Sequence, residues 1–189
     1  DGEWRNVEKD EGKLHDFMGF TMTSEGFYSS GHPSVQSDYE NPFGLIKSID
    51  GGESLDLLNL EGEVDFHIMS ASYNANSLYV MNPEPNSKMN ELSLYRTLDE
   101  GEEWEQSNMN GVEGDVLALA SHPDQEDIVA LSTENGLYIS EDAGDNFESL
   151  LYNVPVTALT FTHTGEILLA EGVGGKSKLK IINLSGVEK

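Results

Sequence analysis

A short motif recurs three times in the chain, and its spacing limits the folds that the sequence can adopt. Each copy has a hydroxyl residue, any residue, Asp, any residue, Gly, two further residues and then a large apolar residue. Its aspartates are Asp50, Asp99 and Asp142, so the copies repeat after 49 and then 43 residues. Periods of about 40 to 50 residues are typical of propeller blades, which are four-stranded sheets.

The motif has the chemistry of a tight turn between two strands. Asp and Ser or Thr side chains accept hydrogen bonds from backbone N–H groups of their own turn, and Gly adopts a positive φ without steric cost. The apolar residue then begins the next strand, although the first copy has Leu55 where the other two have an aromatic residue. We assign structural roles in these turns to Ser48, Asp50, Gly52, Thr97, Asp99, Gly101, Trp104, Ser140, Asp142, Gly144 and Phe147.

Short apolar runs, separated by Pro, Asn-Gly and Asp-x-Gly turns, surround each motif and predict strands, one of them over residues 64–73. The sequence therefore predicts one all-β domain, a β-propeller of four-stranded blades with about four blades present. Full blades are expected over residues 8–60, 61–109 and 110–153, three strands of a further blade over 154–189, and an orphan outer strand over 1–7. Either residues 1–7 complete the last blade and close a small ring, or the chain is a part of a larger propeller.

The composition excludes several classes of function. Lys and Arg number 10 and Asp and Glu number 35, a net charge of −25, which disfavours nucleic acid and anionic lipid as partners. No apolar run is long enough for a transmembrane helix, so membrane insertion is not expected. The absence of cysteine excludes disulfides, thiolate catalysis and cysteine-ligated metals.

The unit over residues 116–147, with Asp142, Gly144 and Phe147, resembles the BNR or Asp-box repeat, and the resemblance extends over nearly the whole chain. Propellers of this family include sialidases, sortilin-type receptors, photosystem assembly factors of the Ycf48 type and xyloglucan-active glycosidases. Residues 15–20 and 26–33 also look like bacterial exported proteins labelled as BNR-repeat glycosyl hydrolases. The resemblance implies that the Asp-box turns hold the fold, and it implies an extracellular or cell-envelope location.

One departure from the family excludes a sialidase. Sialidases bind the substrate carboxylate through three arginines, whose guanidinium groups form paired hydrogen bonds. This chain has two arginines, Arg5 and Arg96. A single copy cannot assemble that triad.

Histidines and nearby aspartates form the candidate site. His15 and Asp16 begin one expected inner strand, Asp65 and His67 begin the next, and His32 stands where a long insert, residues 31–43, starts. If inner strands line a central channel, these five residues can meet at its mouth. Imidazole and carboxylate groups there can bind a divalent metal or transfer protons; ordinary hydrogen-bonded channel lining is the competing interpretation.

Other residues have simpler interpretations. His122 and His163 end inner strands and are expected in turns, and the methionines of the strands are expected in the core. Tyr39 and Phe43 lie in the insert outside the repeat pattern and can stack on a sugar or a partner.

We therefore expect an exported recognition or scaffold module that binds glycan or protein at the channel mouth. The alternative is a glycoside hydrolase-like or metal-assisted hydrolase with a His/Asp site, and a third hypothesis is an assembly factor of the Ycf48 type, for which the ten basic residues offer no evident basic patch. No cofactor is expected beyond a divalent metal at the His/Asp site. Self-association is expected if the chain is a half-propeller.

Overall fold

The computed structural model describes residues 14–184, whose strands form four antiparallel sheets. In each sheet the strands follow one another in chain order. The sheets comprise β1 (Asp16–Met22), β2 (Phe27–His32), β3 (Leu45–Ser48) and β4 (Asp56–Asn59); β5 (Met69–Ala71), β6 (Leu78–Met81), β7 (Leu94–Thr97) and β8 (Glu105–Gln106); β9 (Val116–Ser121), β10 (Val129–Thr133), β11 (Gly136–Ser140) and β12 (Glu148–Tyr152); and β13 (Val156–Phe161), β14 (Ile167–Val173) and β15 (Lys176–Ile182).

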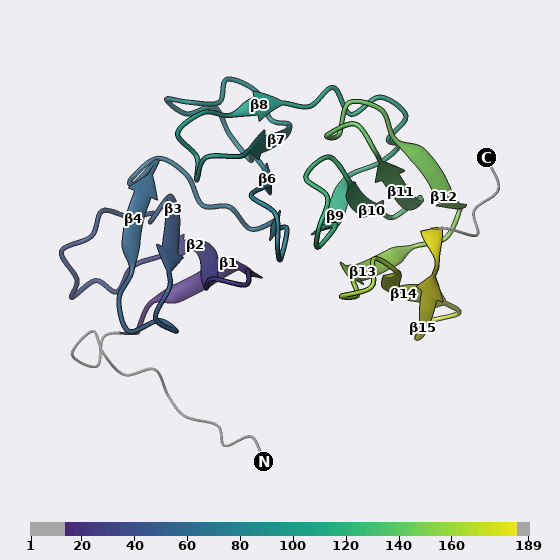
Figure 1. Cartoon of the computed structure of the whole chain (residues 1–189), viewed down its shortest axis with the longest axis horizontal. Coiled ribbons are helices and arrows are strands. Elements are labelled where there is room, and N and C mark those ends of the chain that lie inside the picture. Colours follow the sequence, from purple (N-terminus) through teal and green to yellow (C-terminus); the bar gives the residue numbers. More distant parts are fainter. Residues whose placement is uncertain (1–13, 185–189) are drawn as a thin grey trace, which may run out of the picture.

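The predicted all-β, four-blade propeller is confirmed, with a three-stranded fourth sheet. The predicted outer strand over residues 1–7 lies outside the described residues. Figure 1 shows the sheets following an arc, with the first strand of each sheet toward the centre and the first and fourth sheets at the two ends. No helix among residues 14–184 is long and apolar enough to cross a membrane.

Neighbouring inner strands are held together by side-chain hydroxyls. The Ala71 N–H donates to Thr21 Oγ1 at 2.9 Å, which joins β5 to β1. The Ser121 N–H donates to Ser70 Oγ, also at 2.9 Å, which joins β9 to β5. Hydrogen bonds of the same kind thus hold the inner strands β1, β5 and β9 side by side.

A hydrophobic layer lies between each pair of consecutive sheets. Leu45, Phe66 and Val80 belong to the layer between the first and second sheets. Tyr79 and Val129 belong to the next layer. The last layer contains Leu137 and Ile139 from the third sheet and Ile167 and Leu169 from the fourth. Apolar burial between sheet faces therefore stabilises the arc.

The three Asp-x-Gly motifs form the same turn, each between the last two strands of its sheet. In the third copy, Ser140 Oγ donates to Asp142 Oδ1 at 2.8 Å and accepts the Gly144 N–H at 2.9 Å. Asp142 also accepts the Asn146 N–H at 2.9 Å. Equivalent bonds at 2.8–2.9 Å are made by Ser48, Asp50 and Gly52 and by Thr97, Asp99 and Gly101.

The glycines of the three motifs share one backbone conformation. Gly52, Gly101 and Gly144 have φ values of 89°, 87° and 89°, a region that favours glycine. The apolar position that follows reaches the core to different degrees. Phe147 is buried, whereas Trp104 and Leu55 are only partly buried. Trp104 packs against the first layer.

Two expectations about the strands are wrong. Residues 64–73 were expected to form one strand, but β5 spans three residues, because Val64 and Phe66 are buried by an irregular segment that packs into the first layer. Met18 and Met22 were expected in the core, but they are 43% and 52% exposed, because they project from β1 away from the second sheet.

Candidate functional site

Three of the five predicted site residues, His32, Asp65 and His67, meet near the beginning of the inner strands. Asp16 opens β1 and lies opposite His32, the last residue of β2, in the ladder. Asp65 and His67 lie in the irregular segment before β5 rather than on the strand itself. The segment nevertheless brings both residues to the end of β2.

Asp65 is the centre of this cluster. His67 Nε2 lies 2.7 Å and His32 Nε2 lies 3.2 Å from the same oxygen, Asp65 Oδ2. The other carboxylate oxygen, Oδ1, accepts a long hydrogen bond of 3.4 Å from Ser30 Oγ. The Asp65 side chain is 11% exposed, whereas His32 and His67 are 45% and 59% exposed, so the imidazoles face solvent above a nearly buried carboxylate.

His15 lies apart from Asp65, under the insert. The Ser34 N–H donates to His15 Nδ1 at 3.0 Å, and the ring is 5.1 Å from Phe43 and 5.9 Å from Tyr39 between centroids. Phe43 is fully buried, so the expectation that it stacks on a ligand is wrong: the side chain serves as the small core of the insert. His32 Nδ1 also contacts Asn41 Oδ1 at 2.7 Å, which ties the insert to the His32–Asp65–His67 cluster.

The cluster offers proton donors and acceptors to a solute. Two imidazoles on one carboxylate can exchange protons and can donate hydrogen bonds. Within residues 14–184, no group of three or more His, Asp or Glu residues has the arrangement of a metal site. The divalent metal expected at the His/Asp site therefore has no preformed ligand set in the described part of the chain.

A larger feature, not expected from the sequence, lies toward the other end of the inner strands. A central cavity of about 700 Å³ is lined by the second halves of β1, β9 and β13, by all of β5, and by the turns that follow these strands. The aromatic side chains Phe20, Tyr73 and Phe161 contribute to its wall. Hydroxyl and amide groups from all four sheets complete it: Thr21, Ser70, Asn74, Ser121, Thr160 and Thr162.

Among residues 14–184, no acidic side chain lines the central cavity, although the chain has 35 Asp and Glu residues. Its one ionisable imidazole is that of His163, which was expected only as a turn residue. The cavity went unpredicted because small hydroxyl residues in a strand look like ordinary surface. A sequence signal does exist: Thr21 and Ser70 occupy the inner strands of consecutive blades.

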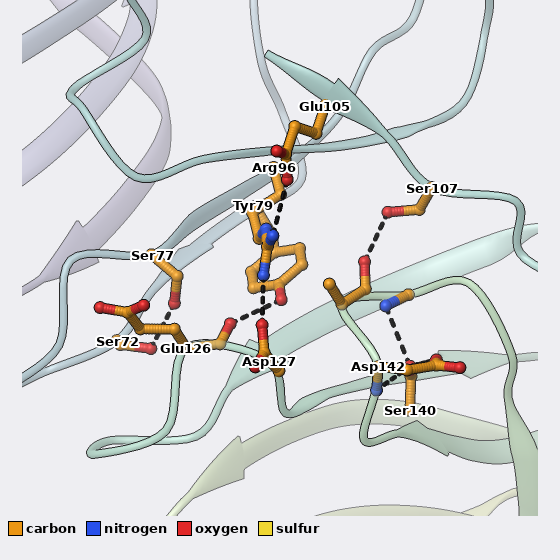
Figure 2. A network of polar contacts seen from close by, with 12 residues as sticks. Ser72, Ser77, Tyr79, Arg96, Glu105, Ser107, Glu126, Asp127, Ser140 and Asp142 are labelled. Atoms are coloured by element: carbon orange, nitrogen blue, oxygen red, sulfur yellow. Dashed lines mark hydrogen bonds and ion pairs between the residues drawn. The ribbon is translucent and has the colours of Figure 1, made fainter. Parts of the chain in front are cut away.

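Arg96 occupies a third polar feature, a groove between the second and third sheets (Figure 2). Its guanidinium contacts Glu105 at 2.6 Å and Asp127 at 2.5 Å, and its side chain is 12% exposed. Burial alone lowers the pKa of Arg96, but the hydrogen bonds to Glu105 and Asp127 outweigh burial and raise the pKa above its usual value. Beside it, burial raises the pKa of Tyr79 to about 12, and its hydroxyl donates to the Glu126 carbonyl at 2.7 Å.

These contacts make Arg96 an inter-sheet tie. Asp127 begins the segment that leads into β10, whereas Arg96 and Glu105 belong to the second sheet. The guanidinium already binds two carboxylates and the side chain is only 12% exposed, so Arg96 offers little surface to a ligand. Arg5, the other arginine of the sequence, lies outside the described residues.

Comparisons with known proteins show similarity at the level of the fold. No protein-family model matches the chain. No curated protein matches it either. Among solved structures, the GH74 enzyme of Niastella koreensis is 12% identical with a TM-score of 0.61, and the match covers 89% of this chain and 29% of the enzyme.

Two further structures are also similar. Ycf48 bound to a D1 peptide is 15% identical with a TM-score of 0.51, covering 93% of this chain and 56% of that protein. An ancestral GH74 enzyme is 13% identical with a TM-score of 0.50, covering 91% of this chain and 26% of the enzyme. This chain therefore spans between about a quarter and just over half of the lengths of these proteins. At such identities the likeness shows a propeller fold, and it assigns neither substrate nor partner.

Proposed function

We propose that this protein is an exported recognition module that binds an uncharged segment of a glycan or a protein in the central cavity. The observation that carries the proposal is the lining of that cavity, which combines aromatic side chains with hydroxyl and amide groups and contains no carboxylate from the described part of the chain. Such a lining provides stacking surfaces and neutral hydrogen-bonding groups, which suit binding. Glycoside hydrolysis, by contrast, uses a pair of carboxylates.

The fold is consistent with this role. Four sheets packed through hydrophobic layers form a rigid frame, and the turns at the cavity rim can vary without affecting it. One structural neighbour, Ycf48, is described in complex with a peptide, and two others are GH74 enzymes. These neighbours support protein and glycan as the two candidate ligand classes, and export is tested by locating the protein in fractionated cells of its source.

Binding at the central cavity is tested by replacing Phe20 with Ala. A panel of neutral β-linked oligosaccharides and of uncharged short peptides is screened by thermal shift, and a ligand that raises the melting temperature is measured by calorimetry. Phe20→Ala should weaken that ligand about tenfold, because one aromatic contact contributes about 1 kcal/mol or more. The matched control Leu117→Ala changes a similarly exposed side chain on inner strand β9 outside the cavity and should leave affinity unchanged.

Equal loss of affinity in the two variants would place the ligand elsewhere. A panel in which no compound shifts the melting temperature would contradict a small-ligand site in the cavity.

The hydrolase alternative rests on a different observation, the convergence of two imidazoles on Asp65. We expect no turnover of chromogenic glycosides above background, with or without added Zn²⁺ or Mn²⁺. Turnover that falls about a hundredfold in Asp65→Asn, the loss typical of a removed acid–base group, would instead establish a hydrolase. Asp124→Asn, which changes an aspartate of the turn after β9, is the matched control and should not alter any rate.

A further inference from the structure

The two sheets at the ends of the arc each have a face that no other sheet covers (Figure 1). In the first sheet, Gly19 and Thr21 of β1 point toward β5, so the alternate residues of β1 point away from the second sheet. Among these, Phe20 is 53% and Met22 is 52% exposed. The register also places Phe27, Ser29, Ile46 and Leu57 on this face. Leu57 is 37% exposed, whereas Ser29 and Ile46 at the middle of the face are already buried.

The fourth sheet likewise has one face that is covered by a neighbouring sheet and one that is not. Ile167 and Leu169 of β14 are buried against the third sheet, so their alternates face outward. Leu179 pairs with Ala170 and is 72% exposed, and Ile181 pairs with Leu168 and is 61% exposed. The outward face consists of Ala158, Thr160, Leu168, Ala170, Leu179 and Ile181.

Within the described strands, neither outward face contains a charged residue, although charged residues make up 24% of the chain. Exposed apolar faces of this kind mark surfaces that are covered in the functional protein. The three layers inside the chain show how such a face is covered: the forward face of one sheet packs on the backward face of the next. The fourth sheet has an uncovered forward face, and the first sheet has a backward face on which Phe20, Met22 and Leu57 are exposed.

We propose that these two faces bind each other between two copies of this chain. The fourth sheet of one copy packs on the first sheet of the other, in both directions, so that two arcs close one ring. Each contact continues the packing already made three times within the chain. The dimer therefore has two-fold symmetry with two equivalent contacts, each between unlike faces, and closure of the ring prevents open-ended growth.

The net charge of −25 opposes this assembly and provides a test of its physical basis. Two like-charged copies repel each other, and salt screens the repulsion between their surfaces. The apolar contact itself is not weakened by screening. The dissociation constant measured by sedimentation velocity should therefore fall as salt is raised from 0.05 to about 0.5 M.

Two variants test the faces separately. Leu179→Lys and Leu57→Lys each place an ammonium group in one of the two faces and should raise the dissociation constant about tenfold or more, since an unpaired buried charge is costly. Leu92→Lys is the matched control: Leu92 is 69% exposed and lies between β6 and β7, away from both faces. All three changes reduce the negative charge equally, so electrostatics cannot explain a difference between them.

Mixing the two variants distinguishes contact between unlike faces, fourth sheet on first sheet, from contact between like faces. A mixed pair retains one intact contact, between the unchanged fourth sheet of Leu57→Lys and the unchanged first sheet of Leu179→Lys, so mixing should restore part of the association. A chain that stays monomeric at all soluble concentrations would overturn the proposal, as would growth beyond two copies.

Discussion

Replacing Gly144 by Ala should lower the free energy of unfolding by about 3 kcal/mol, through backbone strain and overpacking together. Gly144 has a φ of 89°, where a Cβ is strained. The added Cβ would also lie 2.7 Å from Ser107 Oγ and 2.8 Å from Leu94 Cδ2, both in the second sheet. The third turn is therefore pressed against the neighbouring sheet, and no side chain fits between them.

The measurement is thermal unfolding followed by circular dichroism. For a chain of this length, a loss of about 3 kcal/mol corresponds to a fall in melting temperature of about 6 to 12 °C. Gly51→Ala is the control, because Gly51 also has a positive φ, 75°, but an added Cβ there meets nothing within 4 Å. Similar losses in the two variants would show that strain alone acts and that packing of this turn against the second sheet contributes nothing.

Acid should unfold this protein steeply below about pH 4, because three turn carboxylates are hydrogen-bonded in their ionised form. Hydrogen bonds from the Ser54 N–H and then the Ser54 hydroxyl lower the pKa of Asp50 to about 2. The Glu103 N–H lowers the pKa of Asp99, and the Asn146 side chain lowers that of Asp142. A carboxyl whose pKa is lowered by folding stabilises the fold above its ordinary pKa of 3.8 and loses that contribution as the pH falls through the lowered value.

A second effect has the opposite sign at milder acidity. Between pH 7 and about pH 4, protonation of other carboxylates reduces the repulsion within a chain of charge −25, so stability should first rise. The melting temperature is therefore expected to pass through a maximum near pH 4 to 5 and then fall.

The variant Asp142→Asn measures how much the third turn contributes to the pH dependence of the melting temperature. An amide stays neutral, so the variant should melt below the unmodified protein at pH 7, and the difference should narrow toward pH 2. A difference that stays constant from pH 7 to pH 2 would show that ionisation of Asp142 does not stabilise the turn.

The sequence alone determined the class of fold, because the information was local. A turn of the form hydroxyl-x-Asp-x-Gly closes its own hydrogen bonds within five residues, so three copies with apolar runs between them predict four sheets in series. The same locality predicted which residues would form the turns. It overestimated the strand over residues 64–73, because Val64 and Phe66 alternate to fill a hydrophobic layer rather than to pair in a ladder.

The site was only partly accessible from the sequence. The repeat pattern placed His32, Asp65 and His67 near the ends of neighbouring strands. The structure brings them together around one carboxylate oxygen. His15 was expected in the same group, but it packs against Tyr39 and Phe43 of the insert. No local sequence pattern predicts contacts between residues about 25 positions apart.

What only the tertiary structure decided are the central cavity and the two uncovered faces. The cavity exists because four inner strands from distant parts of the chain place Thr21, Ser70 and Thr160 around one space, and each of these residues alone looks like ordinary surface. The uncovered faces exist because every sheet offers two faces, and packing leaves one free at each end of an arc. The hydrogen bonds of a turn join residues close together in the chain, so they can be predicted from the sequence. Cavities and uncovered faces depend on contacts between residues far apart in the chain, which only the folded structure defines.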